Sequence, residues 1–297
     1  MAPSNLGLRP PSPGHEPGTW RAPEALRKAG LLNDLMPARV HQLGRPRYHF
    51  EPQVGTRVRN GQEMRKFSES LATQVGDILS RGAFSLVLGG DCSILLGCLL
   101  GARQGGICGL IHVDGHSDFM HPGDFSPGTV PHSAAGMDLA LASGRGESLL
   151  TDWGQGLRPL VADRHIVQIG EREDGDPDYA YPDIKQTRIT RINVQTALAR
   201  GVGATARQAL ERLETERIDR VWLHVDVDVL DQKIMPAVDS PGSPGFNFDQ
   251  LADLARRLRA SSRIIGADIS VFDPELDPEG IYGRGLAQCL ARAFGPL

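Results

Sequence analysis

The sequence of 297 residues has few cysteines, few aromatic residues and no excess of basic charge. Its four cysteines form neither a dense disulfide pattern nor a CxxC pair, so a reduced, cytoplasmic protein is expected. The net charge of −4 gives no polycationic surface, which disfavours nucleic acid and anionic membranes as partners. No apolar run has the length of a membrane span, and the first residues lack the pattern of a secretory signal.

The remaining composition is that of an ordinary globular protein, with 40% hydrophobic and 23% charged residues. Short apolar runs alternate with stretches of helical spacing, a pattern that predicts a parallel sheet covered by helices on both faces. No internal repeat or linker interrupts the alternation, so residues 1–297 are interpreted as one domain. Strands are predicted at Phe84–Leu88, Gly109–Val113, His165–Ile169, Arg220–Val225 and Arg263–Ile269. Helices are predicted at Ala22–Lys28, Asn60–Ser80, Ile94–Leu100, Ala134–Ala142, Ala204–Thr215, Asp249–Ala260 and Gly285–Phe294.

The stretch Leu110–Phe119 carries the strongest chemical signal. Its first, mostly apolar half is followed by Asp114, His116 and Asp118. An extended chain would place these three side chains on one face. Burying two carboxylates and an imidazole at a strand end is costly unless a cation lies among them. A divalent metal ion is the expected occupant.

A second acidic cluster follows the apolar run Val221–Val225. His224, Asp226 and Asp228 alternate there, again at the end of a predicted buried strand. Aspartate at a strand end often caps a turn, so either cluster alone has an ordinary structural interpretation. Two such clusters meeting at the carboxyl edge of one sheet favour two divalent ions that share bridging carboxylates.

Several stretches, in this order along the chain, resemble the arginase/agmatinase superfamily of binuclear manganese ureohydrolases. The resemblance implies the arginase-like fold, a three-layer αβα arrangement with a central, mostly parallel sheet. It covers nearly the whole chain. The matching stretches are Glu16–Gly30, the Gly-Gly-Asp-Cys-Ser turn at Gly89–Ser93, Asp114-Gly-His116-Ser-Asp118, and Asp226-Val-Asp228-Val-Leu-Asp231.

The resemblance implies a pair of Mn²⁺ ions and a metal-bridging hydroxide that attacks the planar carbon of a guanidino or amidino compound. Asp114 and Asp226 would bridge the ions, and Asp228 would also steady the hydroxide or the tetrahedral intermediate by hydrogen bonding. Cys92 and Asp118 would complete one metal site, and His116 and Asp228 the other. Family members are often oligomers, so a homo-oligomer is expected.

The leaving amine needs a proton, which calls for a nearby acid. His132 lies near the position of the family's proton-shuttling histidine, displaced by one residue in spacing. His121 is the alternative for this role.

Cys92 stands where the family has a histidine ligand. A thiolate favours softer ions than Mn²⁺, so Zn²⁺, Ni²⁺, Co²⁺ or Fe²⁺ also fits this site. Three interpretations stay open at the sequence level: weak manganese binding, selection of another metal, or a buried thiol that does not coordinate. His112 and His224, each two residues before a proposed ligand, are candidates to compensate.

Val271 stands where the family has the glutamate that pairs with the substrate guanidinium. Valine accepts no hydrogen bond, so a standard arginase is disfavoured. Glu171 and Glu173 are candidate replacement carboxylates for the substrate. The structural alternative for these two residues is a solvated acidic loop with a salt bridge to Arg172.

The leading interpretation is therefore a metal-dependent hydrolase of a C–N bond in a linear guanidino or amidino compound. Cys92 and the Asp-Gly-His-x-Asp-Phe form of the second motif are similar to the branch that hydrolyses N-hydroxyarginine in secondary metabolism. A non-catalytic or single-metal protein of the arginase fold is the second interpretation. A deacetylase of the related fold is a third, and Asp118 and the Gly-Gly-Asp turn argue against it.

Overall fold

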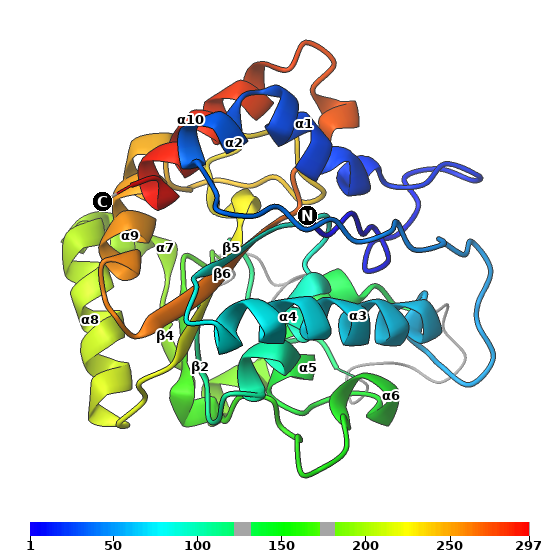
Figure 1. Ribbon diagram of the computed structural model, residues 1–297, viewed down its shortest axis with the longest axis horizontal. Helices are drawn as coiled ribbons and strands as arrows, with labels where there is room; N and C mark the ends of the chain where they lie inside the picture. Colours follow the sequence, from blue (N-terminus) through cyan, green and yellow to red (C-terminus); the bar gives the residue numbers. More distant parts are fainter. Residues whose placement is uncertain (122–131, 173–181, 297) are drawn as a thin grey trace.

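The computed structural model describes residues 1–121, 132–172 and 182–296. Its centre is a six-stranded sheet in the order β1-β6-β5-β2-β3-β4, and every neighbouring pair is parallel (Figure 1). The sheet predicted as mostly parallel is thus entirely parallel. The strands are β1 Ser85–Leu88, β2 Gly109–Val113, β3 Ile166–Ile169, β4 Thr190–Ile192, β5 Val221–Asp226 and β6 Ile264–Ser270.

Helices cover the sheet on both sides (Figure 1). The α-helices are α1 Ala22–Lys28, α2 Leu31–Leu35, α3 Gly61–Ser80, α4 Ile94–Arg103, α5 Asp138–Ala142, α6 Ser148–Thr151, α7 Val194–Arg200, α8 Val202–Thr215, α9 Phe248–Arg259 and α10 Ile281–Phe294. Short 3₁₀ turns include η1 Gly18–Arg21, η3 Ala134–Gly136, η4 Asp163–His165, η6 Pro182–Gln186, η7 Val227–Val229 and η8 Pro274–Leu276. Among the described residues, no helix is both long and apolar enough to span a bilayer.

The predicted three-layer α/β architecture is confirmed. The predicted helix at Ala134–Ala142 is split into η3 and α5, and both β4 and α7 were missed. Strand β4 has three residues, too few to show a period. Helix α7 begins at an Asn193 cap, whose side chain accepts a hydrogen bond from the Thr196 N–H.

The two faces of the sheet bury different hydrophobic clusters. Leu110 and Trp222 pack with α3, α4 and α5, whereas Ile111 and Leu223 pack with α8, α9 and α10. Successive side chains in a strand point to opposite faces. His112 and His224 share the parity of Leu110 and Trp222, so both imidazoles lie on the α3–α5 side.

The amino-terminal segment lies against the turn that follows β1. Ala2 forms a parallel bridge with Gly89, and the Ser4 hydroxyl donates a 2.6 Å hydrogen bond to Asp91. A Cβ atom on Gly90 would lie 1.8 Å from the Ser4 carbonyl oxygen, so this close approach requires glycine.

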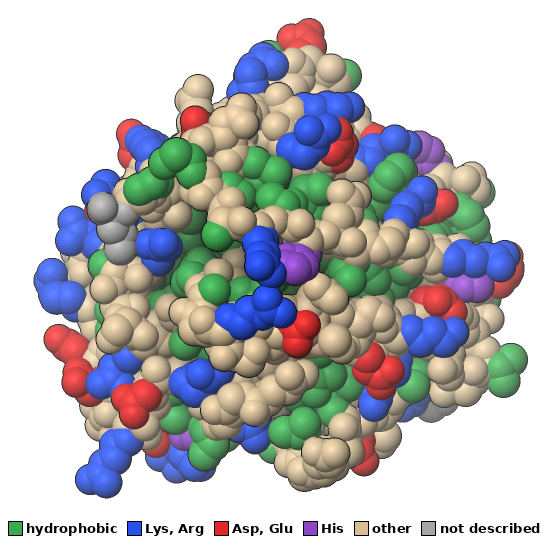
Figure 2. All heavy atoms as spheres, in the orientation of Figure 1, with side chains coloured by type: hydrophobic (Ala, Val, Ile, Leu, Met, Phe, Trp, Pro, Cys, Tyr) green, Lys and Arg blue, Asp and Glu red, His purple; other side chains and the backbone are tan. Residues whose placement is uncertain are grey.

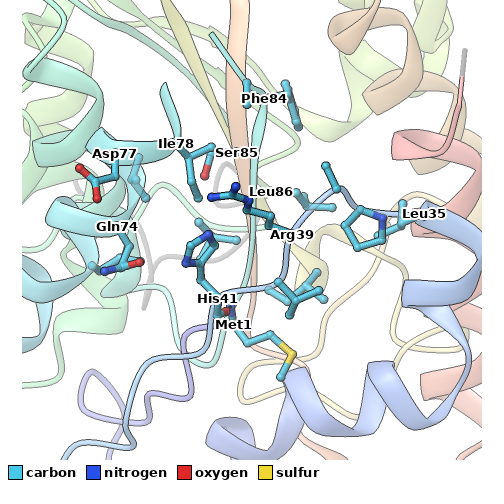
Figure 3. A pocket seen from close by; sticks show the side chains of 18 of the residues that line it. Met1, Leu35, Arg39, His41, Gln74, Asp77, Ile78, Phe84, Ser85 and Leu86 are labelled. Atoms are coloured by element: carbon cyan, nitrogen blue, oxygen red, sulfur yellow. Dashed lines mark hydrogen bonds between the residues drawn. The ribbon is translucent and has the colours of Figure 1, made fainter. Parts of the chain in front are cut away.

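A pocket of about 390 Å³ lies beside the edge strand β1 (Figure 3). Arg39, His41, Gln74 and Asp77 contribute polar groups to its mostly apolar wall. None of the motif carboxylates lines it, so this pocket is not the predicted metal site. On the face shown in Figure 2, acidic and basic side chains are interspersed, as the small net charge predicts.

Candidate metal centre

The polar motifs meet at the carboxyl edge of the sheet. Strands β2 and β5 are neighbours, with Val113 opposite Val225, so Asp114 and Asp226 lie at the same level. The turn that contains Cys92 follows β1 at this edge, and the Cys92 Sγ donates a 2.8 Å hydrogen bond to Asp226 Oδ2. Residues 134 positions apart in the sequence are thus brought into contact.

The geometry of this convergence differs from the prediction. The chain bends after Val113, and Asp118 has a left-handed backbone with φ of 45°. Asp228 lies in η7 rather than on β5. The directions of these side chains are therefore set by turns and not by the alternation of side chains along an extended strand. The expectation that each cluster lies on one strand face is wrong.

Asp114, His116 and Asp228 form the first group of potential ligands, with donor atoms within 4.8 Å of one another. His116 Nδ1 lies 2.9 Å from Asp228 Oδ2, and the Gly115 N–H donates to Asp228 Oδ1 at 3.0 Å. The His116 N–H donates to Asp114 Oδ1 at 2.6 Å. Backbone donors thus orient both carboxylates before any ion binds.

Cys92, Asp118 and Asp138 form the second group, also within 4.8 Å. Asp138 was not anticipated. It begins α5, whose other residues are apolar, and its side chain is fully buried. The signal that could have revealed it is this one acidic residue in the otherwise apolar run Met137–Ala142.

The carboxylates strongly perturb one another. Burial and then the neighbouring aspartates raise the pKa of Asp114 well above its usual range, and burial followed by Asp228 does the same to Asp226. Burial also raises the pKa of the Cys92 thiol, with Asp226 adding to the effect. Asp228 differs: burial, the largest single cause, would raise its pKa, but His116, Arg172 and the Gly115 N–H together outweigh burial and lower it.

These groups fit a bound cation. Asp114 Oδ2 is buried and has no hydrogen-bond partner, and four neighbouring aspartates act on Asp114 electrostatically. An ionised carboxylate in that position is costly unless positive charge compensates it. Oxygen, imidazole and thiolate donors together are a ligand set for divalent metals.

Arg172 is the cationic side chain that contacts Asp228. Its Nη2 donates to the Asp228 carbonyl oxygen at 2.5 Å and lies 3.9 Å from the Asp228 carboxylate. A Cβ on Gly115 would lie 2.2 Å from this guanidinium, and a Cβ on Gly242 2.4 Å, so both glycines make room for it. One guanidinium does not balance the several aspartates gathered here.

The two buried histidines of β2 and β5 form a third group with Asp114. The rings of His112 and His224 stack with centroids 4.6 Å apart. Burial, the largest single cause, would lower the pKa of His224, but Asp268, Asp138 and Asp226 together outweigh burial and raise it to about 9.

The structure distinguishes the two histidines suggested for proton transfer. His121 is engaged in a short contact with Asp183 and meets the ring of Phe119 edge-on. His132 lies in a bridge to Val58, and Arg9 acts electrostatically on both His132 and Asp239. Burial, followed by Arg9, lowers the pKa of His132.

Of the two carboxylates suggested for the substrate, the structure describes only Glu171. Glu171 is buried and pairs with Arg191 at 2.6 Å, so it is not a solvated loop residue. A substrate guanidinium would have to displace Arg191. Glu173 lies outside the described residues. Val271 is buried, with φ of 76°, which is a strained conformation for a β-branched residue.

Fold and site together define a parallel α/β protein with a buried cluster of potential metal ligands at the carboxyl edge of its sheet. A model of the arginase family matches residues 12–294, and the chain belongs to this family. It is 31% identical over 289 residues to an arginase from Bacillus caldovelox, which covers 94% of this chain and 93% of the relative.

Solved structures show the same fold. An arginase from Bacillus subtilis superposes with a TM-score of 0.81 at 25% identity, covering 99% of this chain and 96% of the other. Proclavaminate amidino hydrolase from Streptomyces clavuligerus superposes with a TM-score of 0.67 at 18% identity, covering 98% and 88%.

Proposed function

We propose that the protein is a metal-dependent hydrolase that cleaves a C–N bond of a linear guanidino or amidino compound. Membership of the arginase family supports the reaction class. The observation that carries the proposal is the buried Asp114 Oδ2, which has no hydrogen-bond partner among carboxylates of raised pKa. Such an atom needs a cation, and a cation pair is what the reaction requires.

We assign Asp114 and Asp226 as bridging ligands of two divalent ions. Cys92 and Asp118 would complete one site, and His116 and Asp228 the other. Mn²⁺ suits the oxygen and imidazole donors, whereas the thiolate of Cys92 favours Zn²⁺, Co²⁺, Ni²⁺ or Fe²⁺ at its site. Divalent ions bound there would lower the pKa of water enough to supply hydroxide near neutral pH.

The protein's own groups prepare the reaction. The Gly115 N–H and His116 fix the Asp228 carboxylate, and Arg172 anchors its main chain. With its pKa below the usual range, His132 is neutral near pH 7 and ready to take up a proton that it then passes to the leaving amine.

The substrate is proposed to be a guanidino compound other than free arginine. The curated relative from Bacillus caldovelox is an arginase, so arginine belongs in the test. Val271 offers no charge partner at the position where the family resemblance places the substrate-binding glutamate. Release of urea or amine should be measured for arginine, agmatine, N-hydroxyarginine and other guanidino acids with Mn²⁺, Zn²⁺, Co²⁺ and Ni²⁺. Lack of turnover in every combination would contradict the proposal.

N-hydroxyarginine is the specific substrate favoured by Cys92. This proposal is supported by the donor atoms of Cys92, Asp118 and Asp138, which lie within 4.8 Å of one another. A kcat/KM for N-hydroxyarginine at least about tenfold above that for arginine, roughly 1.4 kcal/mol in the transition state, is the expected result.

We also propose a cytoplasmic location, which is consistent with four cysteines that are free and buried. A homo-oligomer is proposed as well.

Metal affinity should rise with pH. Because the pKa values of Asp114, Asp226 and Cys92 are raised, protons compete with the metal for these ligands. We expect the Kd for Mn²⁺ to fall roughly tenfold per pH unit for each proton released. Isothermal titration calorimetry in buffers of different ionisation enthalpy measures the number of protons released when the metal binds. A pH-independent Kd would show that these groups do not bind the metal.

The raised pKa values of Asp114 and Asp226 also make the stability of the metal-free protein depend on pH. A carboxyl group whose pKa is raised by folding stabilises the fold below its unfolded pKa, and this contribution is lost as pH rises towards the folded value. The metal-free protein should therefore melt at a lower temperature near pH 8 than near pH 6, and Mn²⁺ should reverse the loss. Differential scanning calorimetry with and without chelator measures both effects.

The Cys92→His substitution should strengthen Mn²⁺ binding at one site. An imidazole binds this ion better than a thiol whose pKa is raised. We expect the weaker of two Mn²⁺ dissociation constants to fall by about tenfold or more, roughly 1.4 kcal/mol. Cys98→Ala is the control. Cys98 is also a buried free thiol, but it lies on α4, and its replacement should change neither dissociation constant. Unchanged affinity in Cys92→His would place Cys92 outside the metal site.

A further inference from the structure

We propose that His112, His224 and Asp138 form an additional divalent-metal site, adjacent to the metal pair and sharing Asp114 with it. All four side chains are buried, and the three that define the site have no measurable exposure. The site lies between β2, β5 and α5 on the α3–α5 side of the sheet. It does not depend on which guanidino compound, if any, the protein hydrolyses.

The hydrogen bonds of His112 leave a lone pair facing Asp138. Gln168 donates its amide N–H to the His116 carbonyl oxygen at 2.6 Å, so its Oε1 faces His112. His112 Nδ1 must therefore carry a hydrogen to meet that oxygen. The other ring nitrogen, Nε2, lies 3.1 Å from Asp138 Oδ1. An unprotonated nitrogen this close to a carboxylate needs a positive charge between them.

The surroundings of His224 lead to the same conclusion. Asp268 accepts a hydrogen bond from Trp222 Nε1 at 2.5 Å and one from His224 Nδ1 at 2.6 Å. His224 Nε2 is then left without a hydrogen-bond partner, 3.6 Å from Asp138 Oδ2. That separation is too long for a hydrogen bond. Asp138 Oδ2 also has no partner.

The two histidines thus have the arrangement typical of metal ligands. Ligating histidines donate one ring N–H to a carboxylate or amide oxygen and present the other nitrogen to the ion. Here Asp268 and Gln168 occupy the supporting positions. Both Nε2 atoms are directed towards Asp138, and the donor atoms of His112, His224 and Asp114 lie within 4.8 Å of one another.

Three donor separations at this site are close to the spacing of ligands around one ion. Ligands bound at metal distances of about 2.0–2.2 Å in a tetrahedron lie roughly 3.3–3.6 Å apart. His112 Nε2 lies 3.1 Å from Asp138 Oδ1 and 3.7 Å from Asp114 Oδ2, and His224 Nε2 lies 3.6 Å from Asp138 Oδ2. Such a donor set suits Zn²⁺ or Co²⁺.

Protons on both imidazoles are the competing source of positive charge. That arrangement would stack two imidazolium rings with centroids 4.6 Å apart in a site without solvent. Like charges at such a distance are unfavourable in a buried environment. One ion between the two nitrogens removes the conflict and also satisfies the unpartnered atoms Asp138 Oδ2 and His224 Nε2.

Anomalous diffraction from crystals of the unmodified full chain grown with Zn²⁺ tests the proposal without any variant. We expect a peak at the zinc edge between His112 Nε2 and His224 Nε2, separate from any peaks beside Asp226. A peak between the histidines with none beside Asp226 would support this inference while removing the metal pair of the proposed function. Peaks beside Asp226 alone, with none between the histidines, would overturn the inference.

Metal counting after zinc loading gives a second test. The unmodified protein should hold one Zn²⁺ more than His224→Asn, which keeps a donor towards Asp268 but removes Nε2; His224 is used because Asp138 also lies in the group of Cys92 and Asp118. The Kd of this additional Zn²⁺ should rise by more than about 100-fold in the variant. Loss of a residue that only supports a ligand typically weakens metal binding by about 10–100-fold. His165→Asn is the matched control, a buried histidine that belongs to none of the three groups of potential ligands, and should keep the full count. Equal counts in all three proteins would overturn the proposal.

Discussion

Replacing Asp228 by asparagine should lower kcat/KM by at least about 10³-fold, roughly 4 kcal/mol of transition-state stabilisation. The carboxylate accepts from the Gly115 N–H and lies 2.9 Å from His116 Nδ1. An amide removes the negative charge and turns one acceptor into a donor, so it neither binds a cation well nor satisfies both neighbours. Steady-state kinetics and metal analysis by mass spectrometry should show the loss together.

Asp277→Asn is the matched control. Its side chain accepts from two backbone N–H groups at the start of α10, a role that asparagine can take over. We expect this variant to retain activity and metal. An Asp228→Asn protein that keeps both metal equivalents and normal kinetics would contradict the assignment of Asp228 to the centre.

Replacing His132 by alanine should lower kcat by about 10²–10⁴-fold, the usual contribution of a positioned acid or base. The pKa of His132 lies below 6.5 because of burial and Arg9, so the imidazole is neutral near pH 7. The acidic limb of the pH–kcat profile should therefore lie below the ordinary histidine value and disappear in the variant. Metal content should stay unchanged, which distinguishes proton transfer from ligand loss.

His121→Ala provides the comparison for this experiment. His121 is already engaged with Asp183, so its removal should lower kcat by less than about tenfold, the usual scale for a group outside the proton path. A larger loss in His121→Ala than in His132→Ala would reverse the assignment. Added imidazole should partly restore His132→Ala if a missing proton carrier is the cause.

Much of the fold follows from local patterns in the sequence. The apolar runs of β1, β2, β3, β5 and β6 and the helical periods of α3, α8 and α9 predict the elements in their correct order. Parallel pairing then brings strand ends to one edge, which is why Asp114 and Asp226 could be placed together without coordinates. Strand β4 was not predicted because three residues are too few to show an alternation of apolar and polar side chains.

The details of the site depend on contacts that no local pattern contains. Asp138 meets His112 across 26 residues, and Asp268 meets His224 across 44. The left-handed backbone at Asp118 and the turn at Asp228 are set by packing around the chain. Glu171 looked available for substrate because its partner, Arg191, lies on a strand that the sequence did not reveal.

The first residues of the chain supply no ligand, yet they brace the Cys92 turn. The Ser4 hydroxyl and the Gly7 N–H donate hydrogen bonds to the Asp91 carboxylate, and the Gly90 carbonyl oxygen accepts one from the Val271 N–H after β6. Trimming or tagging this end should therefore loosen the turn that holds Cys92 in the candidate metal centre. Purification handles for this protein belong at the opposite terminus.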